Sequence, residues 1–171
     1  LLTEGDSIYM RPKPVGTLVH DALLPGKRLI LFATGTGIAP FGSIIRDPET
    51  YEKFSEVWVT HTCRTGLELA YTKDLLKKFE SNSLLKEMTD NKLKHIFTTT
   101  REKSELMGRM TQLIDNGTFE HLTGNRLSLE MDRVMICGSL AMLEDHKKIC
   151  ESLGMKEGSN SKQGHYVIEK A

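Results

Sequence analysis

Short apolar runs alternate with longer amphipathic stretches along this chain. Five runs have the length and composition of buried strands, at residues 29–33, 57–62, 94–99, 133–137 and 165–169. Between them, apolar residues recur at spacings of three and four, as in amphipathic helices, over residues 38–45, 67–79, 109–116 and 140–153. This alternation predicts a parallel sheet, and right-handed crossovers would put helices on both of its faces. We therefore expect an α/β fold with a doubly wound, five-stranded parallel sheet.

The first 25 residues follow a different pattern. Ile8 and Met10 alternate with polar residues, as in a strand, and residues 17–24 have the pattern of a short helix or an extended connector that ends at Pro25. The sequence opens in the middle of the alternating pattern, so we expect the natural N-terminus to lie upstream. Residues 1–25 are interpreted as a lead-in, and residues 26–171 as the main domain.

Composition and charge narrow the class of protein. The 171 residues suit one domain, and 23 basic residues balance 23 acidic ones, so no nucleic-acid footprint or polybasic membrane surface is indicated. The longest apolar runs are far shorter than the roughly 20 residues of a membrane span. Three cysteines without pairing motifs indicate reduced thiols. We expect a cytoplasmic protein that binds neither membrane nor nucleic acid.

A glycine-rich turn follows the first predicted strand directly. Residues 33–41 read Ala-Thr-Gly-Thr-Gly-Ile-Ala-Pro-Phe. Gly35 and Gly37 remove two side chains where a phosphate would approach the backbone, and Pro40 suits the first turn of the helix that follows. The turn departs from the usual dinucleotide fingerprint, because Pro40 stands where that fingerprint has its third glycine. It therefore predicts pyrophosphate binding, and the alternative is a tight turn that binds nothing.

Arginines stand at the ends of the second and third predicted strands. Arg64 comes where a fold that binds NAD would usually offer a carboxylate, Arg101 ends the next strand, and Arg109 starts the following helix. A guanidinium can grip a 2′-phosphate that a carboxylate would repel, so the pattern favours NADP over NAD. The alternative for each arginine alone is an ordinary surface charge.

The fourth strand ends in a second glycine junction. Gly138 would let a flat ring approach, Ser139 is a candidate helix cap, and Cys137 is either a soft contact to a nicotinamide or a small buried apolar residue. His61 and Cys63 share a strand face, but no second histidine or cysteine pair has ligand spacing, so no metal site is expected.

These segments, taken in chain order with Tyr-Val-Ile-Glu-Lys-Ala at residues 166–171, closely resemble the bacterial ferredoxin/flavodoxin NADP reductases over essentially the whole sequence. The resemblance implies an enzyme in which an N-terminal barrel binds FAD and a C-terminal doubly wound domain binds NADP(H). Residues 1–25 would then be the remnant of the FAD-binding barrel with its linker, and residues 26–171 the NADP-binding domain. Members of the family continue beyond the position of Ala171 with an aromatic residue.

The resemblance also implies which residues form the site. The turn from Thr34 to Pro40 would lie beside the pyrophosphate and the flavin, with Thr36 touching FAD, and the arginines would hold the adenosine phosphate. Cys137 and Glu169 are the catalytic candidates, on the nicotinamide and flavin side. The expected cofactor-binding residues are Thr34, Gly35, Thr36, Gly37, Pro40, Cys63, Arg64, Thr100, Arg101, Arg109, Cys137, Gly138, Ser139 and Ala171.

The implied reaction is hydride transfer between nicotinamide C4 and flavin N5, coupled to one-electron exchange with ferredoxin or flavodoxin. We expect a monomer, and we expect this sequence alone to be inactive without the FAD domain. Two alternatives stay open at this point. One is the NADH-dependent flavin reductase component of an oxygenase, and the other is a nucleotide-binding module without redox activity.

Overall fold

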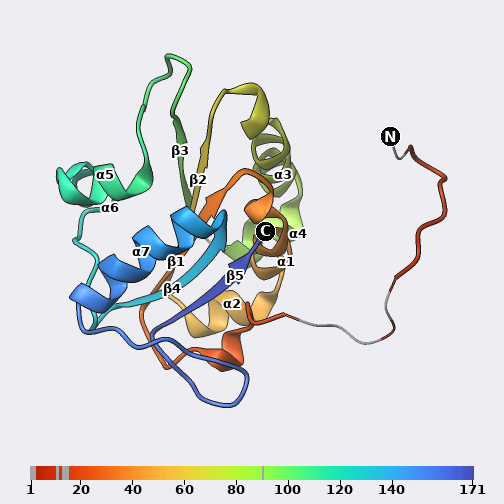
Figure 1. Ribbon diagram of the computed structural model, residues 1–171. Helices are drawn as coiled ribbons and strands as arrows, with labels where there is room; N and C mark the ends of the chain where they lie inside the picture. The colour runs from red at the N-terminus through yellow and green to blue at the C-terminus, as the bar shows by residue number, and fades with distance from the viewer. Residues whose placement is uncertain (1–2, 11, 13–15, 90) are drawn as a thin grey trace.

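Five parallel strands form one sheet at the centre of the molecule (Figure 1). The computed structural model describes residues 3–10, 12, 16–89 and 91–171. The strands are β1 (Arg28–Thr34), β2 (Glu56–Cys63), β3 (Leu93–Thr99), β4 (Asp132–Gly138) and β5 (Tyr166–Lys170). Their order is β3-β2-β1-β4-β5, which runs outward from β1 in both directions. The predicted doubly wound parallel sheet is therefore confirmed, and the switch point lies between β1 and β4.

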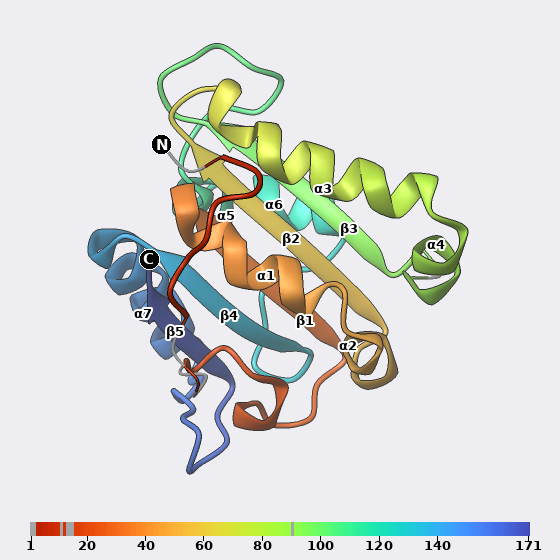
Figure 2. The same cartoon turned by 90° about the vertical axis from the view of Figure 1, so that its right-hand side faces the viewer.

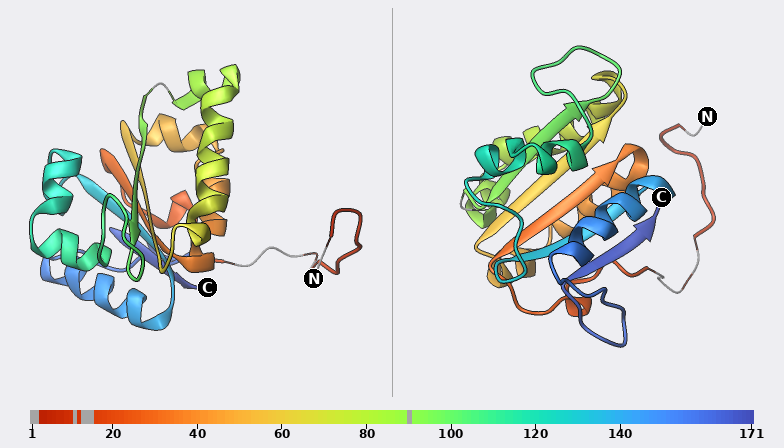
Figure 3. Two further views of the ribbon diagram at one scale, coloured as in Figure 1. Left: turned by 90° about the horizontal axis from the view of Figure 1, so that it is seen from above. Right: turned by 60° about the vertical axis from the view of Figure 1, so that its left-hand side comes forward.

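Helices cover both faces of the sheet (Figures 2 and 3). The first face carries α1 (Ala39–Ile44), α2 (Pro48–Lys53), α3 (Ala70–Ser81) and α4 (Ser83–Thr89). The second face carries α5 (Met110–Asp115), α6 (Thr118–Thr123) and α7 (Leu140–Ser152). Three short 3₁₀ turns complete the described elements: η1 (His20–Ala22), η2 (Gly35–Ile38) and η3 (Leu67–Leu69).

Burial on both faces explains the continuous apolar runs of the central strands. In β1, Leu29 and Leu31 pack with the α1 and α3 side of the core, whereas Ile30 and Phe32 pack with the α5 to α7 side. Successive residues of a strand point to opposite faces, so a sheet covered twice needs apolar residues at every position. The assignments of the central strands made from sequence are correct for this reason.

Three helices were not predicted, and one predicted strand is wrong. The missed helices α2, α4 and α6 have only six or seven residues, too few to establish a periodicity. The start of α2 does carry a signal, because Asp47 Oδ1 accepts a hydrogen bond of 3.0 Å from the backbone N–H of Glu49. Residues 8–10 form no strand and are exposed. Residues 1, 2, 11 and 13–15 of the predicted lead-in lie outside the described part of the chain.

A buried ion pair joins the amino-terminal ends of β1 and β4. Arg28 and Asp132 are 1% and 0% exposed, and the guanidinium grips the carboxylate with contacts of 2.5 Å (Nε to Oδ1) and 2.9 Å (Nη2 to Oδ2). The two side chains also form further hydrogen bonds, since Arg28 Nη2 donates to the Arg126 carbonyl and Asp132 Oδ2 accepts from the Ser128 backbone N–H. The pair fixes the register of β1 against β4 at the end opposite the predicted site.

In the described residues, no helix has both the length and the apolar character that crossing a membrane would require.

Candidate functional site

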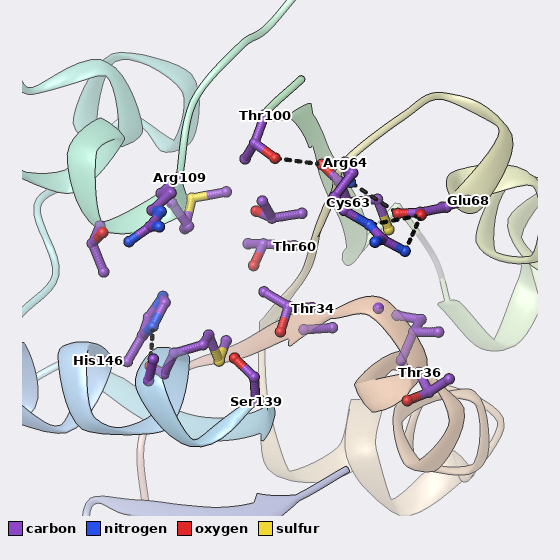
Figure 4. A pocket seen from close by; sticks show the side chains of 18 of the residues that line it. Thr34, Thr36, Thr60, Cys63, Arg64, Glu68, Thr100, Arg109, Ser139 and His146 are labelled. Atoms are coloured by element: carbon purple, nitrogen blue, oxygen red, sulfur yellow. Dashed lines mark hydrogen bonds and ion pairs between the residues drawn. The ribbon is translucent and has the colours of Figure 1, made fainter. Parts of the chain in front are cut away.

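A cavity of about 810 Å³ opens at the carboxyl ends of the central strands (Figure 4). The end of β1 with its glycine turn, the end of β2, the start of α5 and the first two turns of α7 form its walls. This is the crevice in which doubly wound sheets bind their ligands. Eight residues expected from sequence line it: Thr34, Gly35, Thr36, Cys63, Arg64, Thr100, Arg109 and Ser139.

The other expected residues lie outside the lining of this cavity. They are Gly37, Pro40, Arg101, Cys137, Gly138, Glu169 and Ala171. Four of them belong to the carboxyl ends of β4 and β5, where Cys137 is in register with Glu169 and the Ala171 backbone N–H donates to the Gly138 carbonyl at 3.1 Å. Twelve of the expected residues thus form two groups, one around the cavity and one at the β4 and β5 edge, and Gly37, Pro40 and Arg101 belong to neither.

Two glycines allow the β1 and β4 junctions to pack against each other. A Cβ atom on Gly37 would overlap the backbone carbonyl of Cys137, and a Cβ atom on Gly138 would overlap the hydroxyl of Thr34. Gly35 differs, because its φ is +54° and a Cβ there would meet open space. Gly37 is therefore required by packing between strands, whereas Gly35 is required by backbone conformation.

Replacing Gly37 by Ala is expected to lower the free energy of unfolding by about 3 kcal/mol, because the new methyl group meets rigid backbone that must move. Gly35→Ala is the matched control and should cost only about 1 kcal/mol, the price of a left-handed backbone for an L residue. Urea denaturation followed by circular dichroism measures both. Equal losses in the two variants would contradict this account of the turn.

The buried side chain of His61 forms a hydrogen bond to the glycine turn. Its ring is 1% exposed, Nε2 lies 2.9 Å from the Gly35 carbonyl, and Nδ1 lies 2.8 Å from the Thr72 hydroxyl. A carbonyl only accepts, so Nε2 donates to Gly35 and Nδ1 accepts from Thr72. Burial lowers the pKa of His61, which keeps the ring neutral in this arrangement. Both ring nitrogens of His61 are engaged, so its imidazole links the glycine turn to α3.

The ends of β2 and β3 are joined by backbone hydrogen bonds. Thr100 N–H donates to the Cys63 carbonyl, and Arg101 N–H donates to the Arg64 carbonyl, each at 3.0 Å. The loop after β3 folds back to the end of that strand, where the Gly108 N–H donates to the Thr99 carbonyl at 2.9 Å. This return brings Arg109, the next residue, to the cavity.

The two arginines of the cavity are in different electrostatic situations. Arg64 forms an ion pair with Glu68, with Nη2 and Oε1 2.7 Å apart, and its backbone N–H donates to Glu68 Oε2. Those bonds lower the pKa of Glu68, so the carboxylate is charged and offsets Arg64. Arg109 is exposed, and within the described part of the chain it takes part in no ion pair. Arg109 is therefore the cationic group most ready to meet an anion here.

The β4 and β5 edge contains the two catalytic candidates. Cys137 is 2% exposed, and burial, with the nearby Glu169 charge, raises the pKa of its thiol to about 11. The thiol is thus neutral near pH 7, which suits an apolar contact and does not suit a nucleophile. Glu169 is half-buried and accepts a 2.9 Å hydrogen bond from the backbone N–H of Thr17. That bond attaches the segment before β1 to the end of β5.

Several residues that line the cavity were missed from sequence. They include Thr60, Glu68, Tyr71, Met110, Thr111, Met142, Asp145 and His146. Glu68 could have been found, since it stands four residues after Arg64, the spacing of a helical ion pair. His146 carried no comparable signal in the sequence. Which face of α7 turns toward the cavity depends on how α7 packs beside α5.

Comparisons with known proteins agree with this geometry. Residues 31–148 match the family described as the oxidoreductase NAD-binding domain. The sequence is 52% identical to a flavodoxin/ferredoxin–NADP reductase of Rhodobacter capsulatus over 98% of this chain and 62% of that protein. It is 42% identical to a ferredoxin–NADP reductase of Pseudomonas aeruginosa over 99% of this chain and 67% of that protein.

One solved structure has a closely similar fold. A ferredoxin NADP⁺ reductase from Neisseria gonorrhoeae, with bound FAD and NADP, superimposes with a TM-score of 0.76 at 28% identity, over 91% of this chain and 61% of that one. The chain thus spans about three fifths to two thirds of the length of these relatives.

Proposed function

This chain belongs to the oxidoreductase NAD-binding domain family and, within it, to the bacterial ferredoxin/flavodoxin–NADP reductases, and from that membership we propose that its cavity binds NADP(H). The observation that carries the proposal is Arg109, an exposed guanidinium without an ion pair among the described residues, at the wall of a crevice over the carboxyl ends of β1 and β2. A 2′-phosphate is the group that distinguishes NADP from NAD, and a guanidinium is suited to bind it.

The residues of the cavity fit the parts of this dinucleotide. The Gly35 turn offers backbone with open space in front of it, as a pyrophosphate needs. Arg109 supplies positive charge for the adenosine phosphate. Arg64 also lines the cavity, where it is paired with Glu68. Ser139 at the start of α7 lies toward the β4 edge, where the nicotinamide would lie. Arg101 is adjacent to Arg64 through its backbone and would reinforce the charge from outside the cavity.

We assign the β4 and β5 edge to the second cofactor of the proposed enzyme, FAD, which residues 1–25 and sequence beyond this chain would mainly hold. Thr36 and the edge group of Cys137, Glu169 and Ala171 would lie between the two cofactors. Hydride transfer between nicotinamide C4 and flavin N5 is the chemistry that the cofactors supply when bound. The role of this chain is to position the dinucleotide, and the neutral thiol of Cys137 offers an apolar contact there without reacting.

The electron partner in this proposal is ferredoxin or flavodoxin, as the names of the relatives suggest. We further propose that the protein works in the cytoplasm, because its three buried free cysteines suit a reducing compartment, and that it is a monomer. The NADH-dependent alternative is disfavoured by the arginines at the ends of β2 and β3, where such an enzyme would have no use for added cationic charge.

Reconstitution tests the function as a whole. The protein made with an FAD-binding domain of a relative fused before residue 16 should purify yellow and reduce a one-electron acceptor with NADPH, and much more slowly with NADH. The chain alone should bind NADP and show no reductase turnover, because hydride would have no flavin acceptor. A fused, flavin-loaded protein that binds NADP but transfers no electrons would reject the reductase proposal and leave a nucleotide-binding module.

A further inference from the structure

His146 is a buried polar side chain, and one of its ring nitrogens has no hydrogen-bond partner in the described structure. It is 3% exposed, on the inner face of α7, and it lines the cavity. Its Nδ1 lies 2.8 Å from the Met142 carbonyl, which can only accept, so Nδ1 carries the proton. The other nitrogen, Nε2, is therefore an acceptor, and it has no hydrogen-bond partner in the described structure. Burying an acceptor without a partner is costly, which points to a ligand that donates to it.

The surroundings of His146 suit a flat ring. The imidazole packs against the buried Phe32, with ring centroids 4.6 Å apart and planes tilted by 45°, and Met110 and Met142 also line the cavity. Thioether and imidazole side chains in the wall of a cavity favour the face of a base over a phosphate or a ribose. A single polar atom in this apolar wall, His146 Nε2, would recognise a hydrogen-bond donor on the edge of the base.

The position of His146 distinguishes between the two rings of the dinucleotide. It stands seven residues after Ser139, which is about 10 Å farther along α7 and away from the β4 edge. Figure 4 shows it on the same side of the cavity as Arg109, the residue proposed to hold the adenosine phosphate. The base beside that phosphate is adenine, and its exocyclic amino group is a donor.

Building on the proposed function, we propose that His146 Nε2 accepts a hydrogen bond from the adenine amino group of NADP and makes the cavity selective for adenine. Burial lowers the pKa of His146, so the acceptor form is present at neutral pH. The residue acts in recognition of the base and takes no part in the hydride step.

The test compares NADP with its hypoxanthine analogue, in which an oxygen replaces the amino group. Calorimetry on the wild-type chain should show NADP binding about tenfold more tightly, because an oxygen facing Nε2 sets acceptor against acceptor. In His146→Phe, which keeps an aromatic ring packed against Phe32, the affinity for NADP should fall about tenfold and the preference for NADP over the analogue should disappear. His146→Gln, with a side-chain carbonyl as the acceptor, should keep most of the NADP affinity.

A tenfold preference that persists in His146→Phe would overturn the proposal. If that variant fails to give a native circular dichroism spectrum, His146→Met removes the acceptor with a flexible apolar side chain and is judged by the same criterion. Nicotinamide mononucleotide should bind equally to wild type and variants, and a loss there would assign His146 to the other ring and also overturn the proposal. No binding of NADP by wild type would reject the proposed function itself.

Discussion

Replacing Arg109 by Ala is expected to weaken the binding of 2′,5′-ADP by tenfold to a hundredfold. The guanidinium lines the cavity and makes no ion pair among the described residues, so its full charge is available to the 2′-phosphate. One charge-assisted hydrogen bond contributes about 1.5 to 3 kcal/mol, which corresponds to this range of affinity. The measurement is calorimetric titration with 2′,5′-ADP and, beside it, 5′-AMP, which lacks the 2′-phosphate and should lose little.

Arg126→Ala is the matched control for this substitution. Arg126 is also exposed, but it pairs with Glu120 at 2.7 Å and does not line the cavity. Its loss should leave 2′,5′-ADP binding unchanged within twofold. An Arg109→Ala variant that binds 2′,5′-ADP as tightly as wild type would show that the phosphate lies elsewhere, with Arg101 as the next candidate.

The largest effect on stability is expected from Asp132→Ala. Removing this carboxylate leaves the guanidinium of Arg28 buried without its counter-charge and also removes the acceptor of the Ser128 N–H. Breaking a buried ion pair on one side costs about 3 to 5 kcal/mol, which is a large share of the stability of a domain of this size. Urea denaturation should therefore show a midpoint far below that of wild type, with an unchanged slope.

Two comparisons separate the charge effect from simple loss of packing. The double variant Arg28→Met with Asp132→Leu removes both charges and should recover much of the lost stability. Glu120→Ala breaks the exposed pair with Arg126 and should change the free energy of unfolding by less than about 1 kcal/mol. A single Asp132→Ala variant as stable as the Glu120→Ala variant would refute the structural role given to the buried pair.

The sheet could be predicted from sequence because its strands are buried on both sides. Residues 29–33 and 134–137 read as unbroken apolar runs, and both core layers take residues from β1 and from β4. The short helices α2, α4 and α6 could not be read, because six or seven residues give less than two turns of periodicity. Residues 8–10 alternate like a strand but form none, since alternation alone supplies no neighbouring strand.

Site residues could be predicted from sequence where the end of a strand decides their position. They could not be predicted where the packing of loops and side chains decides it. Thr34, Arg64 and Thr100 follow strands that meet at one edge of the sheet, so the cavity brings them together. Arg101 and Arg109 were both expected from sequence, with Arg101 the firmer expectation, yet only Arg109 lines the cavity, because the loop after β3 folds back through Gly108. The requirement for Gly37 to contact Cys137 depends on two strands 100 residues apart in sequence.

The proposed function requires this cavity to recognise the 2′-phosphate of a nicotinamide dinucleotide. Calorimetric titration of the unmodified chain with NADP and with NAD, at one pH and one salt concentration, tests it most directly. We expect NADP to bind at least tenfold more tightly than NAD, and the difference to shrink as salt screens the Arg109 charge. Equal affinities for the two dinucleotides, or no binding of either, would contradict it.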